Sequence, residues 1–231
     1  MGIAGKKYRE AKEKVEKEDF KSWREAVTAV IKTAHAKFDE SVDTDIVLSI
    51  DASKGEQTVR GSVMLPHGTG KKIRVLVFAK GEHEEQAKAA GADYVGFTDL
   101  IEKISGGWME FDVAVATPDL MGQIGKVAKI LGPRGLLPNK KFGTVTLDVA
   151  NIVSDLKKGR LSYRNDKGGC IHAPFGKVSF GEEKLCENLV SLIKSVSSNK
   201  PSSAKGKFIK KIIISSTMGV GISLDQDEIL K

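Results

Sequence analysis

Residues 73–105 carry the pattern that decides the fold, and they read IRVLVFAKGEHEEQAKAAGADYVGFTDLIEKIS. The first six residues are rich in β-branched and aromatic side chains, which is typical of a buried strand. A polar segment, Glu82–Ala90, then predicts a helix that ends at Gly91. A short strand (Tyr94–Phe97) and a short helix (Asp99–Ser105) follow in the same order. Strands that alternate with helices predict a parallel sheet covered by helices.

The same alternation continues to residue 159. Its remaining elements are a strand (Asp112–Ala116), a helix capped by Thr117 with Pro118 at its first position, a strand (Thr144–Leu147) and a helix (Val149–Lys157) ended by Gly159. The first of these helices has one apolar face at helical spacing, made of Leu120, Met121, Ile124, Val127, Ala128 and Leu131. Gly122 and Gly125 lie within it, and we interpret them as close-packing positions. The series as a whole predicts a doubly wound parallel sheet.

The chain on either side of this series has a different pattern, with antiparallel pieces. It contains a charged surface helix (Lys6–Lys21), a helix that starts with a capping box (Ser22 and Glu25) and runs to Ala34, strands at Thr44–Ile50 and Thr58–Leu65 that we expect to pair, strands at Leu161–Arg164, Cys170–Pro174 and Phe208–Ser215, and a helix at Glu182–Val196. A breaker-rich segment, Pro66–Gly70, separates the two patterns. We therefore expect an α/β protein of two domains. A split α+β domain (residues 1–67 and 160–231) carries an inserted Rossmann-like three-layer α/β domain (residues 68–159).

Charge narrows the class of partner. The chain has 231 residues and a formal net charge of +7. Residues 160–231 hold 12 basic and 7 acidic side chains, which accounts for most of that surplus. A second basic stretch contains no acidic residue, and its cations are Lys126, Lys129, Arg134, Lys140 and Lys141. Two basic regions far apart in the sequence favour a long anionic partner such as a folded nucleic acid.

Motifs of nucleotide, cofactor and metal sites are absent from the sequence. No G-x-G-x-x-G follows the first strand of the insert, and no G-x-x-x-x-G-K-[ST] occurs. Cys170 and Cys186 do not form a Cys-x-x-Cys pair, so we expect free thiols in a cytoplasmic protein, without a metal or a cofactor. No apolar run approaches the roughly 18 residues of a membrane span. An enzyme that binds a nucleotide through the α/β insert is the alternative, and a nucleotide-binding assay would test it.

Three loop segments combine residue types that RNA-binding sites use. They are Lys37–Ser41, Arg164–Lys177 and Ser215–Gly221. Cations meet phosphates, hydroxyls pair with the ribose 2′-OH, flat or soft side chains cover bases, and glycine lets the backbone approach. Spacing alone is equally consistent with ordinary turns, which glycine and serine also favour.

The stretch Ile130–Val145, ILGPRGLLPNKKFGTV, resembles a signature of the bacterial large-subunit ribosomal protein L-one family, the protein of the mobile ribosomal stalk. The pattern of the same family occurs in Lys37–Ser41, in Arg164–Lys167 followed by Ile171–Pro174, and in Ser216–Gly219. The resemblance implies a non-enzymatic RNA-binding protein with a split domain and a Rossmann-like insert. It places RNA contacts at Lys37, Phe38, Ser41, Asp166, Lys167, His172, Thr217, Met218 and Gly219, to which we add Arg164 and Ser216 from the same segments.

The resemblance also implies the partners. They are the stalk region of large-subunit rRNA, other ribosomal components, deacylated tRNA at the exit site, and the messenger of its own operon, which the free protein would repress. We expect a ribosome-associated protein that is monomeric when free, with weaker RNA contacts from the insert at Lys126, Arg134, Lys140 and Lys141. Ser41 stands where the family often has threonine, and Val220 where it often has proline. A stand-alone RNA chaperone or repressor is a third hypothesis, which cosedimentation with large subunits would test.

Overall fold

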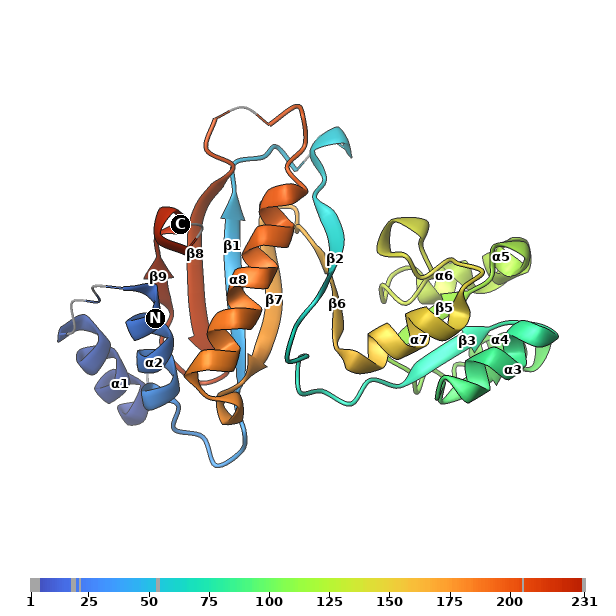
Figure 1. Ribbon diagram of the computed structural model, residues 1–231, viewed down its shortest axis with the longest axis horizontal. Helices are drawn as coiled ribbons and strands as arrows, with labels where there is room; N and C mark the ends of the chain where they lie inside the picture. The colour runs from blue at the N-terminus through green and yellow to red at the C-terminus, as the bar shows by residue number, and fades with distance from the viewer. Residues whose placement is uncertain (1–4, 18–19, 21, 53–54, 205, 230–231) are drawn as a thin grey trace. The chain divides into compact units, whose positions relative to one another are not determined.

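The computed structural model describes residues 5–17, 20, 22–52, 55–204 and 206–229. It is a mixed α/β structure with several sheets (Figure 1). The chain divides into two compact units. Unit 1 comprises Met1–Gly70 and Leu161–Lys231, and unit 2 comprises Lys71–Arg160.

Unit 1 is built on a four-stranded antiparallel sheet with the strand order β7-β1-β8-β9. Its strands are β1 (Ser41–Leu48), β7 (Cys170–Lys177), β8 (Ile209–Ser216) and β9 (Ile222–Leu224). Burial alternates along β1, so that Val42, Ile46 and Leu48 share one core with residues of α2 (Trp23–Thr33) and α8 (Glu182–Ser198). The side chains at the other positions, from Ser41 to Val47, are only partly buried. They belong to the side of the sheet that we call the open face.

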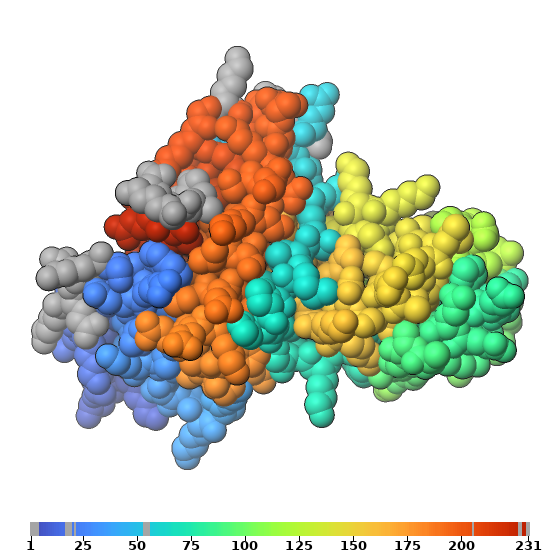
Figure 2. Space-filling view, in the orientation of Figure 1, coloured from blue at the N-terminus to red at the C-terminus, as the bar shows by residue number. Residues whose placement is uncertain are grey.

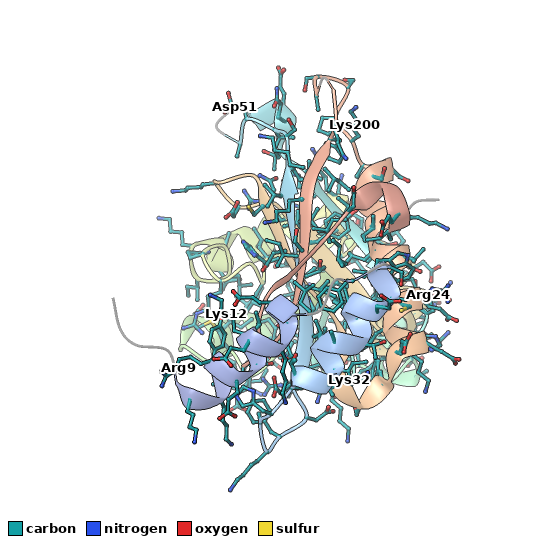
Figure 3. The ribbon with its side chains drawn as sticks, turned by 90° about the vertical axis from the view of Figure 1, so that its left-hand side faces the viewer. Arg9, Lys12, Arg24, Lys32, Asp51 and Lys200 are labelled. Carbon is teal, nitrogen blue, oxygen red and sulfur yellow. The ribbon has the colours of Figure 1, made fainter. Side chains whose placement is uncertain are left out.

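The helices of unit 1 follow the local signals of the sequence. Ser22 Oγ accepts a hydrogen bond from Glu25 N at 3.3 Å, which confirms the predicted cap of α2. The predicted apolar face of α8 is buried throughout, at Leu185, Leu189, Leu192, Ile193 and Val196. Figure 3 shows that Arg9 and Lys12 come from α1 (Lys6–Lys17) and that Arg24 and Lys32 come from α2, and all four are exposed. Residues 18, 19 and 21 of the helix predicted for Lys6–Lys21 lie outside the described residues.

The predicted pairing of the first two strands is wrong. β1 pairs with β7 and β8, whereas β2 (Arg60–Met64) pairs with β6 (Arg160–Arg164) in a separate two-stranded sheet. The alternation of side chains shows which face of a strand is buried, but it does not identify the partner strand. β1 lies in the centre of its sheet because two strands from the distant end of the chain occupy both of its edges.

Unit 2 contains a parallel sheet with the strand order β4-β3-β5. Its elements are β3 (Val75–Phe78), α3 (Glu82–Ala89), β4 (Tyr94–Gly96), α4 (Thr98–Ser105), β5 (Val113–Ala116) and α7 (Val149–Lys158). Alternate residues of β3 enter two different cores. Leu76 and Phe78 pack with α4 and the segment after β5, and Val75 and Val77 pack with α3 and α7. Helices therefore cover both faces of the sheet. The strand predicted at Thr144–Leu147 is reduced to one parallel bridge between Val145 and Ala116.

The single helix predicted after Pro118 is broken into short pieces. These are 3-10 helices at Pro118–Leu120 and Gly125–Val127, α5 (Met121–Ile124) and α6 (Ala128–Leu131). Thr117 makes no side-chain capping bond. The close-packing interpretation of Gly122 and Gly125 is also wrong, because a Cβ at either position would meet nothing within 4 Å. Each glycine costs roughly 1 kcal/mol of helix stability, which favours the interruption.

Short elements complete the chain. They are 3-10 helices at Gly55–Gln57, Lys140–Phe142 and Val178–Phe180, and the last helix, α9 (Gln226–Ile229).

Asn188 fixes the irregular segment that follows β2. Its fully buried side chain accepts a hydrogen bond from His67 N (3.1 Å) and donates to Gly68 O (2.9 Å) and Phe175 O (2.8 Å). Figure 2 shows the side chains of α8, in orange, beside those of this segment, in teal. One amide therefore joins two backbone groups of the irregular segment to a carbonyl of β7.

We predict that Asn188→Ala destabilises unit 1 by about 3 kcal/mol, because it leaves two buried carbonyl groups and one partly buried N–H group without a partner. Urea unfolding followed by circular dichroism measures the change. Lys184→Ala is the control, since Lys184 is exposed on the same helix, and it should change stability by less than about 0.5 kcal/mol. Equal stabilities of the two variants would contradict the role of Asn188.

Candidate nucleic-acid interface

Two of the three loop segments meet at the end of the sheet where β1 begins and β8 ends. Val42 is in register with Ser216, and just beyond this pair Thr217 N donates to Ser41 O at 3.0 Å. The Thr217 hydroxyl also donates to Ser41 O (3.2 Å) and accepts a hydrogen bond from Ser41 N (3.0 Å). The β1 and β8 ends are therefore joined by backbone and side chain together.

The carboxylate of Glu40 joins the same two loops from inside. Its side chain is buried, with 2% exposure. Oε1 accepts hydrogen bonds from His35 N (2.9 Å) and Ala36 N (2.7 Å). Oε2 accepts from Ser216 Oγ (2.7 Å) and Met218 N (3.0 Å). Glu40 thus binds the segment before β1 to the segment after β8.

These hydrogen bonds decide the charge of Glu40. Burial raises the pKa of the carboxyl group, but the bonds from Ser216, Ala36, Met218 and His35 outweigh burial and hold the pKa below its ordinary value. Glu40 is therefore ionised at neutral pH, as a carboxylate with four donors should be. This role could not be predicted from the sequence, because two of the four donors, Ser216 and Met218, lie near the other end of the chain.

The loops held by Glu40 present apolar and charged groups outward. Phe38 is 58% exposed and Met218 is 54% exposed, and Lys37 and Thr217 are also exposed. Ser216, by contrast, is buried and its hydroxyl is committed to Glu40, so Ser216 positions the loop and does not form part of its surface.

Glycine is required at position 219. A Cβ there would collide with the Ser216 side chain. The loop that carries the exposed side chain of Met218 is therefore closely packed against Ser216.

The third segment starts near the other end of the sheet, at Arg164 on β6, and then runs along β7 back to Lys177, which is in register with Ser41. Arg164 and Lys167 are exposed there. Asp166 accepts a hydrogen bond from Cys170 N at 2.7 Å, and this bond lowers the pKa of the carboxyl group. Cys170 is in register with Val47, six residues along β1 from Ser41, which corresponds to about 20 Å. The predicted RNA-binding residues therefore form two groups at opposite ends of one sheet.

His172 lies between the two groups. It is opposite Asp45 in the register of β1 and β7, and its Nδ1 lies 2.6 Å from Asp45 Oδ1. Nε2 lies 3.6 Å from Asp166 Oδ2. The hydrogen bond with Asp45 is the main reason that the pKa of His172 is raised, and Asp166 acts in the same direction. The imidazolium form is thus favoured in the folded protein. Its contribution to stability is complete below the ordinary pKa and is lost as the pH rises through the raised one.

Two carboxylates of the open face were not singled out from the sequence. Asp43 and Asp45 alternate with the buried residues of β1, so both lie on the open face with His172. The signal was available, because an acidic pair at alternate positions of an otherwise apolar strand points to one face. The open face therefore carries the carboxylates of Asp43 and Asp45 beside the imidazole of His172.

The insert residues named for weaker contacts all lie on the surface of unit 2. Lys126, Arg134, Lys140 and Lys141 are exposed. Asn139 Oδ1 accepts a hydrogen bond from Lys141 N at 2.9 Å, and Asn139 N donates to Thr144 Oγ1 at 2.8 Å. The last two cations therefore lie on an ordered turn.

Metal sites and membrane-spanning helices were considered for the part of the chain that the structure describes. It contains no group of three or more His, Cys, Asp or Glu side chains arranged to hold a metal ion. None of its helices has the length and apolar character needed to cross a membrane.

Comparison with known families identifies the family of the chain. The model of the ribosomal protein L1p/L10e family matches residues 30–220. The matched range contains all of unit 2 and every residue from Lys37 to Gly219 named above for the interface.

We predict that Glu40→Gln destabilises unit 1 by about 1–3 kcal/mol at pH 7, because an amide nitrogen cannot accept the bonds from Ser216 and Met218. The lowered pKa of Glu40 adds stability that is complete above the ordinary pKa and is lost as the pH falls through the lowered one. The variant should therefore lose less stability on acidification than the unmodified protein. Urea unfolding at neutral and acidic pH measures both effects. Glu183→Gln, an exposed change on α8, is the control, and identical behaviour of the two variants would refute the role of Glu40.

Proposed function

Because the chain belongs to the ribosomal protein L1p/L10e family, we propose that it binds the stalk region of large-subunit rRNA through unit 1. The family is one of rRNA-binding structural proteins of the large ribosomal subunit, and the chain is not an enzyme. In this proposal unit 1 is the RNA-binding domain and unit 2 is a Rossmann-like domain inserted into it. The protein acts as a monomer when it is free of the ribosome.

The observation that carries the proposal is the pair of loops held by Glu40. They place Phe38 and Met218, both exposed, beside Lys37 and the Thr217 hydroxyl. Single-stranded or looped RNA is bound by stacking of bases on flat or soft side chains and by contacts to phosphate and 2′-OH. A buried carboxylate that fixes such side chains in advance lowers the entropy lost on binding.

The Thr217 hydroxyl has one hydrogen-bonding position left for RNA. A hydroxyl has one donor and two acceptor positions. The Ser41 backbone uses the donor and one acceptor position. The remaining lone pair can accept a hydrogen bond from a ribose 2′-OH, which would distinguish RNA from DNA at this point.

A structured RNA is long enough to contact both groups of residues, the one near Met218 and the one near Lys167. The surface near Met218 and the surface near Lys167 are about 20 Å apart along the sheet, so a partner must span that distance to contact both. A folded stem with loops has this length, whereas a mononucleotide does not.

Two further roles belong to the same proposal. The protein assists release of deacylated tRNA from the exit site, and it represses translation of its own operon by binding a stalk-like element of the messenger. The first is tested by chasing labelled exit-site tRNA from ribosomes with and without the protein. The second is tested by a toe-print on the operon messenger, in which added stalk transcript should relieve the block. Cosedimentation with large subunits separates these roles from those of a chaperone acting outside the ribosome.

We predict that Phe38→Ala weakens binding of a stalk transcript about tenfold or more, because it removes one stacking surface. Filter binding or anisotropy with the purified protein measures the affinity. Met64→Ala is the matched control, since Met64 is also a large exposed apolar residue of unit 1, 41% exposed on β2. Unchanged binding by both variants would contradict a role for the Glu40-held loops, and a protein without affinity for the transcript would refute the proposed function.

We predict a different effect for Lys140→Ala in unit 2. Losing one phosphate contact should lower the slope of log affinity against log salt by nearly one unit, with a modest loss of affinity at physiological salt. The same titration repeated over a range of salt concentrations measures the slope. An unchanged slope would remove Lys140 from the proposed interface.

A further inference from the structure

The helical side of unit 1, which lies across the sheet from the open face, carries an open groove of about 530 Å³. α8 supplies most of its lining, and Trp23 of α2 and Pro66 of the segment after β2 complete it. All of these residues belong to unit 1. The volume falls in the range of ligand pockets, roughly 300–1,000 Å³. The residues named above for RNA contacts do not line this groove.

The groove is acidic, although the chain as a whole has a formal net charge of +7. Among the lining side chains that the structure describes, three are carboxylates, Glu182, Glu183 and Glu187, and one is a cation, Arg24. A surface of this charge repels the phosphates of RNA and attracts cations. The groove therefore requires a partner of the opposite charge to RNA.

Two of the three carboxylates have no partner in the described part of the chain. None of the residues that the structure describes forms a hydrogen bond or an ion pair with Glu182 or Glu183, whereas Glu187 Oε2 lies 2.7 Å from His67 Nε2. Acidic side chains in the first turn of a helix interact favourably with its dipole, which gives Glu182 and Glu183 a local role. The dipole accounts neither for Glu187, one turn further on, nor for the apolar part of the lining.

The apolar part of the lining comes from Trp23, Pro66 and Val190, of which Trp23 and Val190 are partly buried and Pro66 is exposed. The guanidinium carbon of Arg24 lies 5.4 Å from the centroid of the Trp23 ring, a distance at which a cation is attracted to an aromatic ring. Burial, followed by the negative charge of Glu182, raises the pKa of the Cys186 thiol to about 11. The negative charge of the lining therefore acts on groups inside the groove.

We propose that this groove is a docking site for a basic segment of another protein. Lys or Arg side chains of the segment meet the carboxylates of α8, and apolar side chains between them contact Trp23, Pro66 and Val190. A small polycation such as a polyamine has no apolar side chain for this part of the lining, and a purely apolar segment leaves the carboxylates without partners. Because the groove and the open face lie on opposite sides of the sheet, unit 1 has room for both partners at once.

A short labelled peptide that repeats Arg-Leu-Lys-Gly tests the proposal on the full chain. Its counterpart repeats Glu-Leu-Asp-Gly and has the same apolar content. We expect the basic peptide to bind about tenfold more tightly or better, because its charge complements that of the groove. Fluorescence anisotropy measures both affinities, and binding of the basic peptide should weaken as salt is added.

Two variants locate the peptide. Ser191 lines the groove and is partly buried, so Ser191→Arg fills the groove with a cation and should weaken binding about tenfold or more. Ser198→Arg is the matched control, the same change at an exposed position of α8 outside the groove, and it should leave the affinity within about twofold.

The double variant Glu182→Gln with Glu183→Gln removes two charges without adding bulk. It should weaken binding by about threefold to thirtyfold, as expected for the loss of two ion pairs at an exposed rim. Urea unfolding of each variant shows whether unit 1 remains folded. If Ser191→Arg lowers stability, the double variant decides the outcome.

Each remaining outcome overturns the proposal in its own way. Equal binding of the two peptides would show that charge does not select the partner. Unchanged affinity in both groove variants would place the peptide elsewhere on the protein. Displacement of the labelled peptide by spermidine at the concentration that the unlabelled peptide requires would identify a site for small polycations. Binding of the stalk transcript is measured separately, so none of these results bears on the proposed function.

Discussion

The interaction on which the interface depends is the set of hydrogen bonds to the buried carboxylate of Glu40. Four donors from two loops converge on its two oxygens. Glu40 is the one acceptor that both loops share in the bonds described above, and Thr217 with Ser41 adds a second link between them. Hydrogen bonds to a charged group are stronger than those between neutral groups. The exposed positions of Phe38 and Met218 are consequences of this internal arrangement.

The sequence predicted what is locally determined. The cap of α2 at Ser22 and the buried stripe of α8 follow from spacing within one helix, and both were confirmed. The pairing of β1 could not be predicted in this way, because its partners lie more than a hundred residues away and alternation is the same for any partner. Glu40 was missed for a similar reason. Asp43 and Asp45 differ, since the period of β1 already placed both on one face.

The surroundings of the open face contain both cations, which attract a polyanion, and carboxylates, which repel it. Lys37 and Lys167 belong to loops at the two ends of the sheet, Asp43 and Asp45 lie between these ends on β1, and Asp166 is the chain neighbour of Lys167. His172, with its raised pKa, neutralises part of this negative charge. A uniformly basic sheet would bind RNA of any sequence, because phosphate contacts carry no sequence information.

The carboxylates of the open face lower the stability of the free protein. Among the residues that the structure describes, none forms a hydrogen bond or an ion pair with the Asp43 carboxylate. Burial and the negative charge of Asp45 raise its pKa, so the ionised side chain destabilises the folded state. Native structures keep such unfavourable groups mainly where function requires them. The sheet can tolerate Asp43 because β1 is held on both edges, by β7 and by β8, and because its other side is packed against α2 and α8. The position of β1 in the centre of the sheet therefore allows Asp43 to remain on the open face. The local sequence pattern could not predict this position.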